Sequence, residues 1–307
     1  RTPRQQPAIH SVAIAGPFES RGVSQTPSRE QIFSCVPDES IDVMKCATSI
    51  ISSIAQKAFR RPVVESDISA PLAFFERANN ESGFEAGIEM AIRAILVSPK
   101  FLFRIEQDPV DVDSDTVYAL NDVELASRLS FFLWSTIPDK ELMDLAINNQ
   151  LSEAKTLKAQ VERMLADPKA ISLAADFANQ WLYLRNLDGA EPNTRLFPDF
   201  DKNLSQSMRR ETELLFGNII SEDRNVMELL SADYSFLNER LARHYDIPNV
   251  YGDHFRKVSL PEGSPRVGLL GHGSILTVTS YATRTSPVMR GKWVLDNILG
   301  IPPPPPP

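Results

Sequence analysis

Apolar side chains recur at helical spacing through most of the chain, and this periodicity restricts the fold more than any other feature. The clearest stripe comprises Ile50, Ile51, Ile54, Ala55 and Ala58, a spacing that places these residues on one face of a helix. Similar stripes follow Asn121 and Ser152, which are suited to be helix N-caps. Prolines separate the stripes. The sequence therefore predicts a mainly α protein made of multi-helical, bundle-like domains.

Changes in composition and in the pattern of apolar residues divide the chain into segments. Residues 11–15 are apolar and partly β-branched, which predicts a short strand. Gly-rich sequence after Pro248 predicts a looser C-terminal segment, with a last helix from Pro287 to Leu299. Further helices are expected at about 169–187, 201–221 and 235–245. The expected organisation is a tail of an upstream β domain with a linker (1–37), a small helical domain (38–106), an acidic linker (107–117), a larger helical domain (118–249), a C-terminal segment (255–301) and a polyproline spacer (302–307).

The charge balance excludes some classes of partner. The net charge is −8 and the pI is about 5.2, so the chain is a poor candidate for binding nucleic acid. No apolar run reaches about 18 residues, so no membrane span is expected. Arg1 to Gln6 lead into no apolar segment of the kind found in a signal peptide, so a signal for export would lie upstream.

Two cysteines, Cys35 and Cys46, are compatible with free core thiols or with one disulfide. Their separation of 11 residues fits neither a redox C-x-x-C motif nor a zinc knuckle. Cys35 lies in a polar loop before Pro37. Buried free thiols prefer apolar elements, so the loop position favours a bridge.

The common signatures of catalysis are absent from the sequence. It contains no G-x-S-x-G elbow, no G-x-G-x-x-G and no P-loop. The four histidines are far apart, and no metal site is predicted. Glu211 and Glu213 lie two residues apart on an expected helix and therefore do not share a face, so we expect them to be solvated or salt-bridged. The catalytic residues, if any, are unknown from the sequence.

One histidine is a weak candidate for a haem ligand. His272 lies in the Gly-rich stretch Gly271-His272-Gly273, where an imidazole could be exposed. An axial haem ligand, a general base and an ordinary surface residue are the three interpretations.

The stretch from Thr283 to Lys292 carries positive charge where a helix begins. Ser286 is a suitable N-cap, and Pro287 fits the first helical position. The positive end of a helix normally attracts carboxylates, yet Arg284 and Arg290 flank this start. A bound anion would explain them, held by Arg284, Thr285, Ser286 and Arg290. An internal carboxylate such as Asp296 or Glu262 is the alternative.

Several longer motifs resemble a known group of domains. They are Cys46-Ala47 with residues 58–63, Ser98 to Arg104, Leu129 to Trp134 with residues 159–165 and 236–242, and Arg284 to Val288 with Arg290-Gly291 and the proline run. In these stretches, which together cover about residues 10–307, the chain resembles the planctomycete cytochrome-c-associated domains of unknown function.

The resemblance implies an exported multidomain parent protein with a c-type haem attached elsewhere, since this chain has no C-x-x-C-H motif and is expected to carry no cofactor of its own. It also implies that Cys35 and Cys46 form a disulfide. The leading hypothesis is a helical scaffold that packs against a neighbouring haem-bearing domain in electron transfer. The alternatives are an oxidoreductase acting on extracellular polysaccharide and a module that binds anionic polysaccharide, for which a groove lined by Trp181 or Tyr183 would be evidence.

Overall fold

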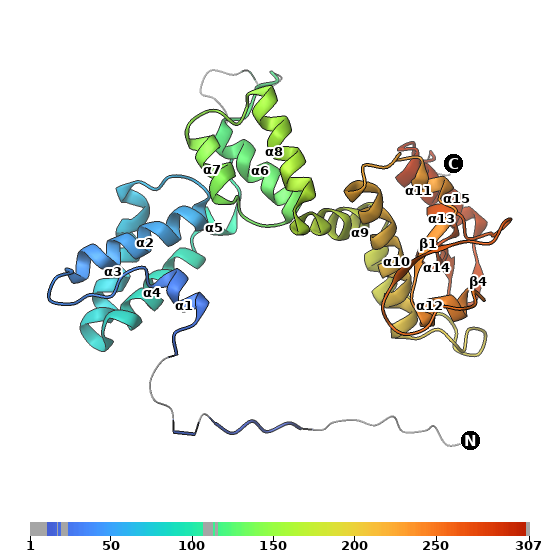
Figure 1. Ribbon diagram of the computed structural model, residues 1–307, viewed down its shortest axis with the longest axis horizontal. Coiled ribbons are helices and arrows are strands. Elements are labelled where there is room, and N and C mark those ends of the chain that lie inside the picture. Colours follow the sequence, from blue (N-terminus) through green and yellow to red (C-terminus); the bar gives the residue numbers. More distant parts are fainter. Residues whose placement is uncertain (1–10, 17, 20–23, 107–112, 114–115, 305–307) are drawn as a thin grey trace. The chain divides into compact units, whose positions relative to one another are not determined.

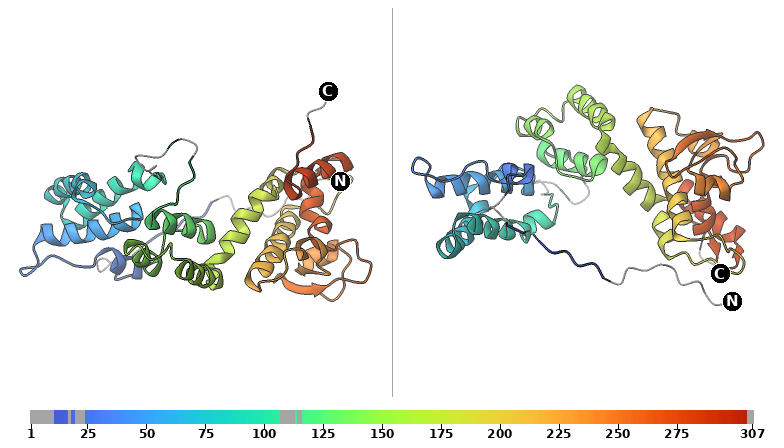
Figure 2. Two further views of the ribbon diagram at one scale, coloured as in Figure 1. Left: turned by 90° about the horizontal axis from the view of Figure 1, so that it is seen from above. Right: turned by 60° about the horizontal axis from the view of Figure 1, so that its bottom comes forward.

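The computed structural model describes residues 11–16, 18–19, 24–106, 113 and 116–304. The chain divides into two compact units, Arg1–Ile105 and Glu106–Pro307 (Figures 1 and 2). Helices dominate both units, which confirms the expected fold class. In the described part of the chain, no helix is both long and apolar enough to cross a membrane.

The first unit is a bundle of helices (Figure 1). They are α1 (Pro27–Ile32), α2 (Val43–Phe59), α3 (Glu65–Ser82), α4 (Phe84–Leu96) and α5 (Pro99–Leu102). The helices α3 and α4 form a hairpin, and α2 packs against both. Their shared core includes Ile50, Phe75 and Ile88. A Cβ atom on Gly87 would lie 2.6 Å from the Phe75 ring, so glycine at this position allows the two helices of the hairpin to approach closely.

Two arginines that follow α2 connect this helix to α3 and to the residues of and after α5. Arg60 follows α2 in the left-handed conformation, with a φ of 58°. Its guanidinium donates to the carbonyl oxygens of Lys100 (3.0 Å) and Phe103 (2.9 Å). Arg61 forms an ion pair with the buried carboxylate of Asp67 at 2.7 Å, and Lys100 reaches the same carboxylate at 2.5 Å. Because the bonds from Arg61 and Lys100 favour the charged form, the pKa of Asp67 lies well below its usual range.

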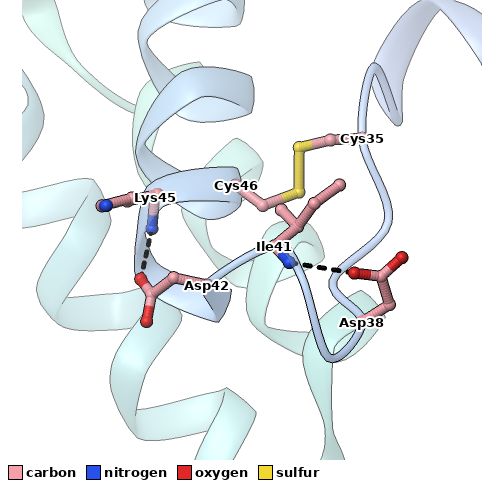
Figure 3. The surroundings of a disulfide bond; sticks show 6 residues. All are labelled: Cys35, Asp38, Ile41, Asp42, Lys45 and Cys46. Carbon is pink, nitrogen blue, oxygen red and sulfur yellow. Dashed lines mark hydrogen bonds between the residues drawn. A yellow bond between two sulfur atoms is a disulfide. The ribbon is translucent and has the colours of Figure 1, made fainter.

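A disulfide between Cys35 and Cys46 ties the loop before α2 to the first turn of that helix (Figure 3). Asp42 caps α2 by accepting a hydrogen bond from the Lys45 N–H at 2.9 Å. Asp38 accepts from the Ile41 N–H at 2.9 Å and shapes the turn between the two cysteines. The disulfide implied by the family resemblance is therefore present.

In its described residues, the second unit contains the remaining helices and four short strands. They are α6 (Asp122–Trp134), α7 (Lys140–Ile147), α8 (Ala154–Ala166), the 3-10 helix η1 (Pro168–Ala170), the π-helix η2 (Leu173–Phe177), α9 (Ala178–Trp181), the 3-10 helix η3 (Leu184–Gly189), α10 (Lys202–Ser221), α11 (Glu228–Ser231), β1 (Tyr234–Leu237), α12 (Glu239–His244), β2 (Arg256–Ser259), α13 (Gly268–Gly271), α14 (Gly273–Val278), β3 (Ser280–Tyr281), β4 (Arg284–Thr285), α15 (Pro287–Trp293) and the π-helix η4 (Val294–Ile298).

The long helix α10 is the element around which much of this unit packs. It contacts α8, α9, α11, α12, α14 and β1. Strands β1 and β2 pair antiparallel, with Tyr234 opposite Ser259, and β3 and β4 form a second antiparallel pair, with Ser280 opposite Thr285. The expected segments 118–249 and 255–301 both lie in this unit.

Several local predictions are corrected by the structure. Residues 11–15 are exposed and form no strand, and a strand without a partner leaves its backbone groups unpaired. The expected helix 235–245 is the strand β1 followed by α12, because β1 pairs with the distant β2. The expected helix 169–187 is broken into 3-10, π and α segments.

The helix caps were predicted with mixed success. Asn121 caps α6 as predicted, accepting from the Glu124 N–H at 2.9 Å. Ser152 does not cap α8, which has Glu153 at its N-cap. The Ser152 N–H instead donates to the buried carboxylate of Asp122.

The Gly-rich C-terminal segment is packed more tightly than expected. Gly268, Gly271 and Gly273 are buried. A Cβ atom on Gly268, whose φ is +58°, would lie 2.4 Å from the backbone of Leu230. Glycine here provides close packing and not looseness. Pro302–Pro304 are exposed and carry no regular structure, whereas Pro305–Pro307 and most of the acidic linker lie outside the described residues.

Loss of the disulfide is expected to destabilise the first unit. Replacing both Cys35 and Cys46 by Ala removes a crosslink that closes a loop of 11 residues in the unfolded chain, which should lower the free energy of unfolding by roughly 2–3 kcal/mol. Urea unfolding followed by circular dichroism measures this. The wild type in dithiothreitol should match the variant, and the variant should not respond to the reductant. An unchanged unfolding midpoint in both would contradict the prediction.

Candidate functional site

A cluster of buried polar side chains surrounds Glu211 in the second unit. Its members are Glu211 and Thr212 on α10, Ser235 on β1, Tyr245 after α12, His272 between α13 and α14, and Ser274 on α14. The Glu211 carboxyl group accepts hydrogen bonds from the Ser235 hydroxyl at 2.5 Å and from the Tyr245 hydroxyl at 2.7 Å. The Gly273 N–H donates to the same Tyr245 hydroxyl at 2.7 Å. These bonds join α10 to three other elements.

His272 is part of this cluster and is only 1% exposed, which corrects the expectation of an imidazole accessible in a Gly-rich turn. Its Nδ1 lies 2.9 Å from the Thr212 hydroxyl, which lies 2.7 Å from the Ser274 hydroxyl. Its Nε2 has no hydrogen-bond partner in the described part of the chain and lies 3.9 Å from Glu211 Oε1. The role of His272 as a haem ligand stays a prediction, made for a side chain that is now seen to be buried.

Burial controls the charge states in the Glu211 cluster. It raises the pKa of Glu211 to about 7, although the bonds from Ser235 and Tyr245 oppose the shift. Burial and, to a smaller extent, the positive charge of Arg266 together lower the pKa of His272 to about 3. Between about pH 3 and pH 7 the carboxyl and the imidazole are therefore both mainly neutral, so their contact is not an ion pair. Because both side chains are only 1% exposed, we interpret the cluster as a structural feature that holds the elements of the second unit together.

The burial of Glu211 was missed in the sequence, where the glutamate was expected to be solvated or salt-bridged. That expectation rested only on the fact that Glu211 and Glu213 do not share a helix face. A better signal was available, because Glu211 continues an apolar stripe at helical spacing formed by Leu204, Met208, Leu215 and Ile219, all of which are buried. A carboxylate within such a stripe predicts a buried acid that needs hydrogen-bond partners.

The predicted anion-binding residues lie beside a surface pocket of about 890 Å³, which we call the hairpin pocket. Its walls are the loop of residues 189–200, the strands β3 and β4 with their turn, and side chains of α10, α12, α14 and α15. Arg284, Thr285 and Arg290 line it. Ser286 does not, because it is buried and caps α15 by accepting from the Met289 N–H at 3.2 Å. The structure therefore brings together three of the four predicted residues.

The internal carboxylates weighed as partners of these arginines do not contact them. Asp296 approaches Lys292 at 4.0 Å. Arg290 donates to the hydroxyls of Thr285 at 2.9 Å and Thr279 at 3.4 Å. The Arg284 guanidinium lies 5.3 Å from the centre of the Tyr281 ring. No carboxylate among the described residues pairs with either arginine. The described part of the chain also contains no group of three or more His, Cys, Asp or Glu that could hold a metal ion.

Models of three protein families match the chain in succession. They are PSD5, a protein of unknown function (DUF1595), at residues 46–106; PSD4, a protein of unknown function (DUF1592), at residues 120–247; and PSCyt3, a protein of unknown function (DUF1588), at residues 266–307. The chain belongs to the planctomycete cytochrome-c-associated domain families, three of which follow one another along it. No curated protein and no solved structure matches it.

The Glu211 cluster joins two of these cytochrome-c-associated domains. Glu211 and Tyr245 belong to the DUF1592 match, and His272 and Ser274 to the DUF1588 match. The bond from the Gly273 N–H to the Tyr245 hydroxyl and the contacts of the Thr212 hydroxyl with His272 and Ser274 cross the boundary between them. The two domains therefore share one buried polar core and fold as parts of one unit.

Glu211→Gln is expected to change the pH dependence of stability. The folded Glu211 keeps its proton up to about pH 7, whereas an unfolded glutamate releases it near 4.5, so its stabilisation is present below 4.5 and is lost as the pH rises to about 7. His272 acts oppositely, because its pKa falls from 6.5 to about 3 on folding, and its stabilisation is lost as the pH falls through this range. Between pH 4.5 and 6.5 the two effects nearly cancel.

Glutamine does not titrate, so only the effect of His272 remains in this variant. Its free energy of unfolding should rise with pH between 4.5 and 6.5 relative to the wild type, by about 1.4 kcal/mol per pH unit. Urea unfolding at a series of pH values measures the slope, and the exposed Glu262→Gln serves as control. Parallel profiles for Glu211→Gln and the wild type would refute the assigned charge states.

Proposed function

We propose that this chain is a scaffold module of an exported, haem-associated electron-transfer protein, and that it holds a neighbouring haem-bearing domain in a fixed orientation. The observation that carries the proposal is the succession of three cytochrome-c-associated domains along one chain. A c-type haem carried by a neighbouring domain would supply the redox chemistry, and this chain would supply the surface on which that domain docks.

The internal bonding of the chain supports a scaffold role. The Arg60 and Arg61 contacts stabilise the first unit, and the Glu211 cluster joins two domains in the second. Buried charged and polar groups that are hydrogen-bonded to several elements restrict the movement of those elements. The disulfide supports export, because such bonds persist in oxidising compartments outside the cytosol.

Binding of the haem-bearing domain of the same parent protein tests the proposal. Isothermal titration calorimetry of the purified chain with that domain should give a saturable complex. The haem reduction potential should shift on binding, because docking changes the exposure of the haem edge to water. An unrelated c-type cytochrome of similar net charge is the control. Absence of binding, together with an identical potential in the isolated domain and the full-length protein, would overturn the proposal.

A further inference from the structure

The hairpin pocket combines chemical groups that the scaffold role does not use. Two arginines, Arg284 and Arg290, come from β4 and α15, and two carboxylates, Glu191 and Asp199, come from the loop of residues 189–200. In the part of the chain that the structure describes, none of these four side chains forms an ion pair. A volume of about 890 Å³ lies within the range of small-molecule sites.

The arginine side of the pocket is prepared for a carboxylate. Arg290 is half-buried, and the Thr285 and Thr279 hydroxyls hold its guanidinium. Its remaining N–H groups form no hydrogen bond with the described residues. Arg284 lies against one face of the Tyr281 ring. A planar guanidinium whose orientation is already fixed loses little freedom when it binds a carboxylate in a two-pronged contact.

The loop side of the pocket is suited to hydroxyl groups and to an apolar ring face. The carboxylates of Asp199 and Glu191 accept hydrogen bonds but cannot donate them when ionised. Phe197 and Tyr281 also line the pocket, and their side chains are 45% and 52% exposed. Exposed aromatic rings at a polar pocket provide flat surfaces on which an amphipathic ligand can stack.

These features together select one class of ligand. The two carboxylates of the pocket would repel a simple anion. A neutral sugar would leave the two arginines without a negatively charged partner. An acidic sugar satisfies both, because it carries a carboxylate, hydroxyl donors and an apolar C–H face. We propose that the hairpin pocket binds a uronic-acid sugar, with its carboxylate at Arg284 and Arg290, its hydroxyls at Asp199 and Glu191, and its ring against Phe197 or Tyr281.

The walls of the pocket are held together without a ligand. The Asn193 N–H donates to the Ala282 carbonyl oxygen at 2.8 Å, which ties the loop to the turn between β3 and β4. The Thr277 hydroxyl on α14 contacts the Met208 sulfur on α10 at 3.8 Å, and both residues line the pocket. The acidic sugar would therefore enter a largely formed site. Neither Trp181 nor Tyr183, the two residues whose groove would have been evidence for a polysaccharide-binding module, lines this pocket.

Calorimetric titration of the full chain tests the site with trimers of galacturonate, glucuronate and mannuronate. At least one trimer should bind. Its methyl ester keeps the shape but loses the charge, and it should bind about tenfold more weakly, as expected for the loss of charge-assisted hydrogen bonds. Arg284→Gln and Arg290→Gln should each reduce this preference for the acid. Asp199→Asn should weaken binding of the acid and the ester alike, because the Asp199 carboxylate would contact the hydroxyl groups that both sugars share.

Lys292→Gln is the matched control, because Lys292 lies on the same helix as Arg290, is 60% exposed and does not line the pocket. Among the described residues the Arg284 side chain makes a ring contact and no hydrogen bond or ion pair. Its variant therefore keeps the test valid if Arg290→Gln disturbs the fold, as judged by melting temperature. Failure of all three trimers to bind, or equal binding of acid and ester, would overturn the site. Binding of a trimer without binding of the haem-bearing domain would retain the site and remove only the proposed scaffold function.

Discussion

The burial of one carboxyl group, that of Glu211, determines how the second unit is assembled. A carboxyl group removed from water must be hydrogen-bonded or neutral, since an unpaired buried charge costs several kcal/mol or more. The partners of Glu211 come from β1 and from the end of α12, and the Tyr245 hydroxyl connects to the start of α14. Hydrogen bonding to a single side chain of α10 thus positions the elements that follow this helix.

Close backbone packing follows from the same requirement. Gly273 donates its N–H to the Tyr245 hydroxyl, and a Cβ atom on Gly273 would lie 2.8 Å from that oxygen. Any larger residue would push α14 away from the cluster and leave polar groups without partners. The glycines near residue 270, which in the sequence indicate a loose segment, therefore serve a tightly packed one.

The sequence allowed the local features to be predicted better than the distant contacts. Helical stripes, the Asn121 cap and the Ser286 cap depend on neighbouring residues, and the structure has them. The strand β1 depends on pairing with β2, and the hydrogen-bond partners of Glu211 are hydroxyls more than 20 residues away, which no local pattern identifies. Arg284 and Arg290 were selected from local charge. Phe197 and Asp199, which share their pocket, come from a loop some 90 residues earlier, and no local pattern links them.

The Glu211 cluster and the hairpin pocket are both built on α10 and α14. Met208 lies one helical turn before Glu211 on α10, and its side chain lines the hairpin pocket and packs beside Gly273. Ser274, at the start of α14, belongs to the Glu211 cluster, whereas Leu276 and Thr277 in the same helix line the pocket. A six-residue helix held at its first turn by buried hydrogen bonds presents its later residues in a fixed register. The polar cluster thus sets the position of one pocket wall, so the bonds that join two family domains also shape the surface that one of them offers to a ligand.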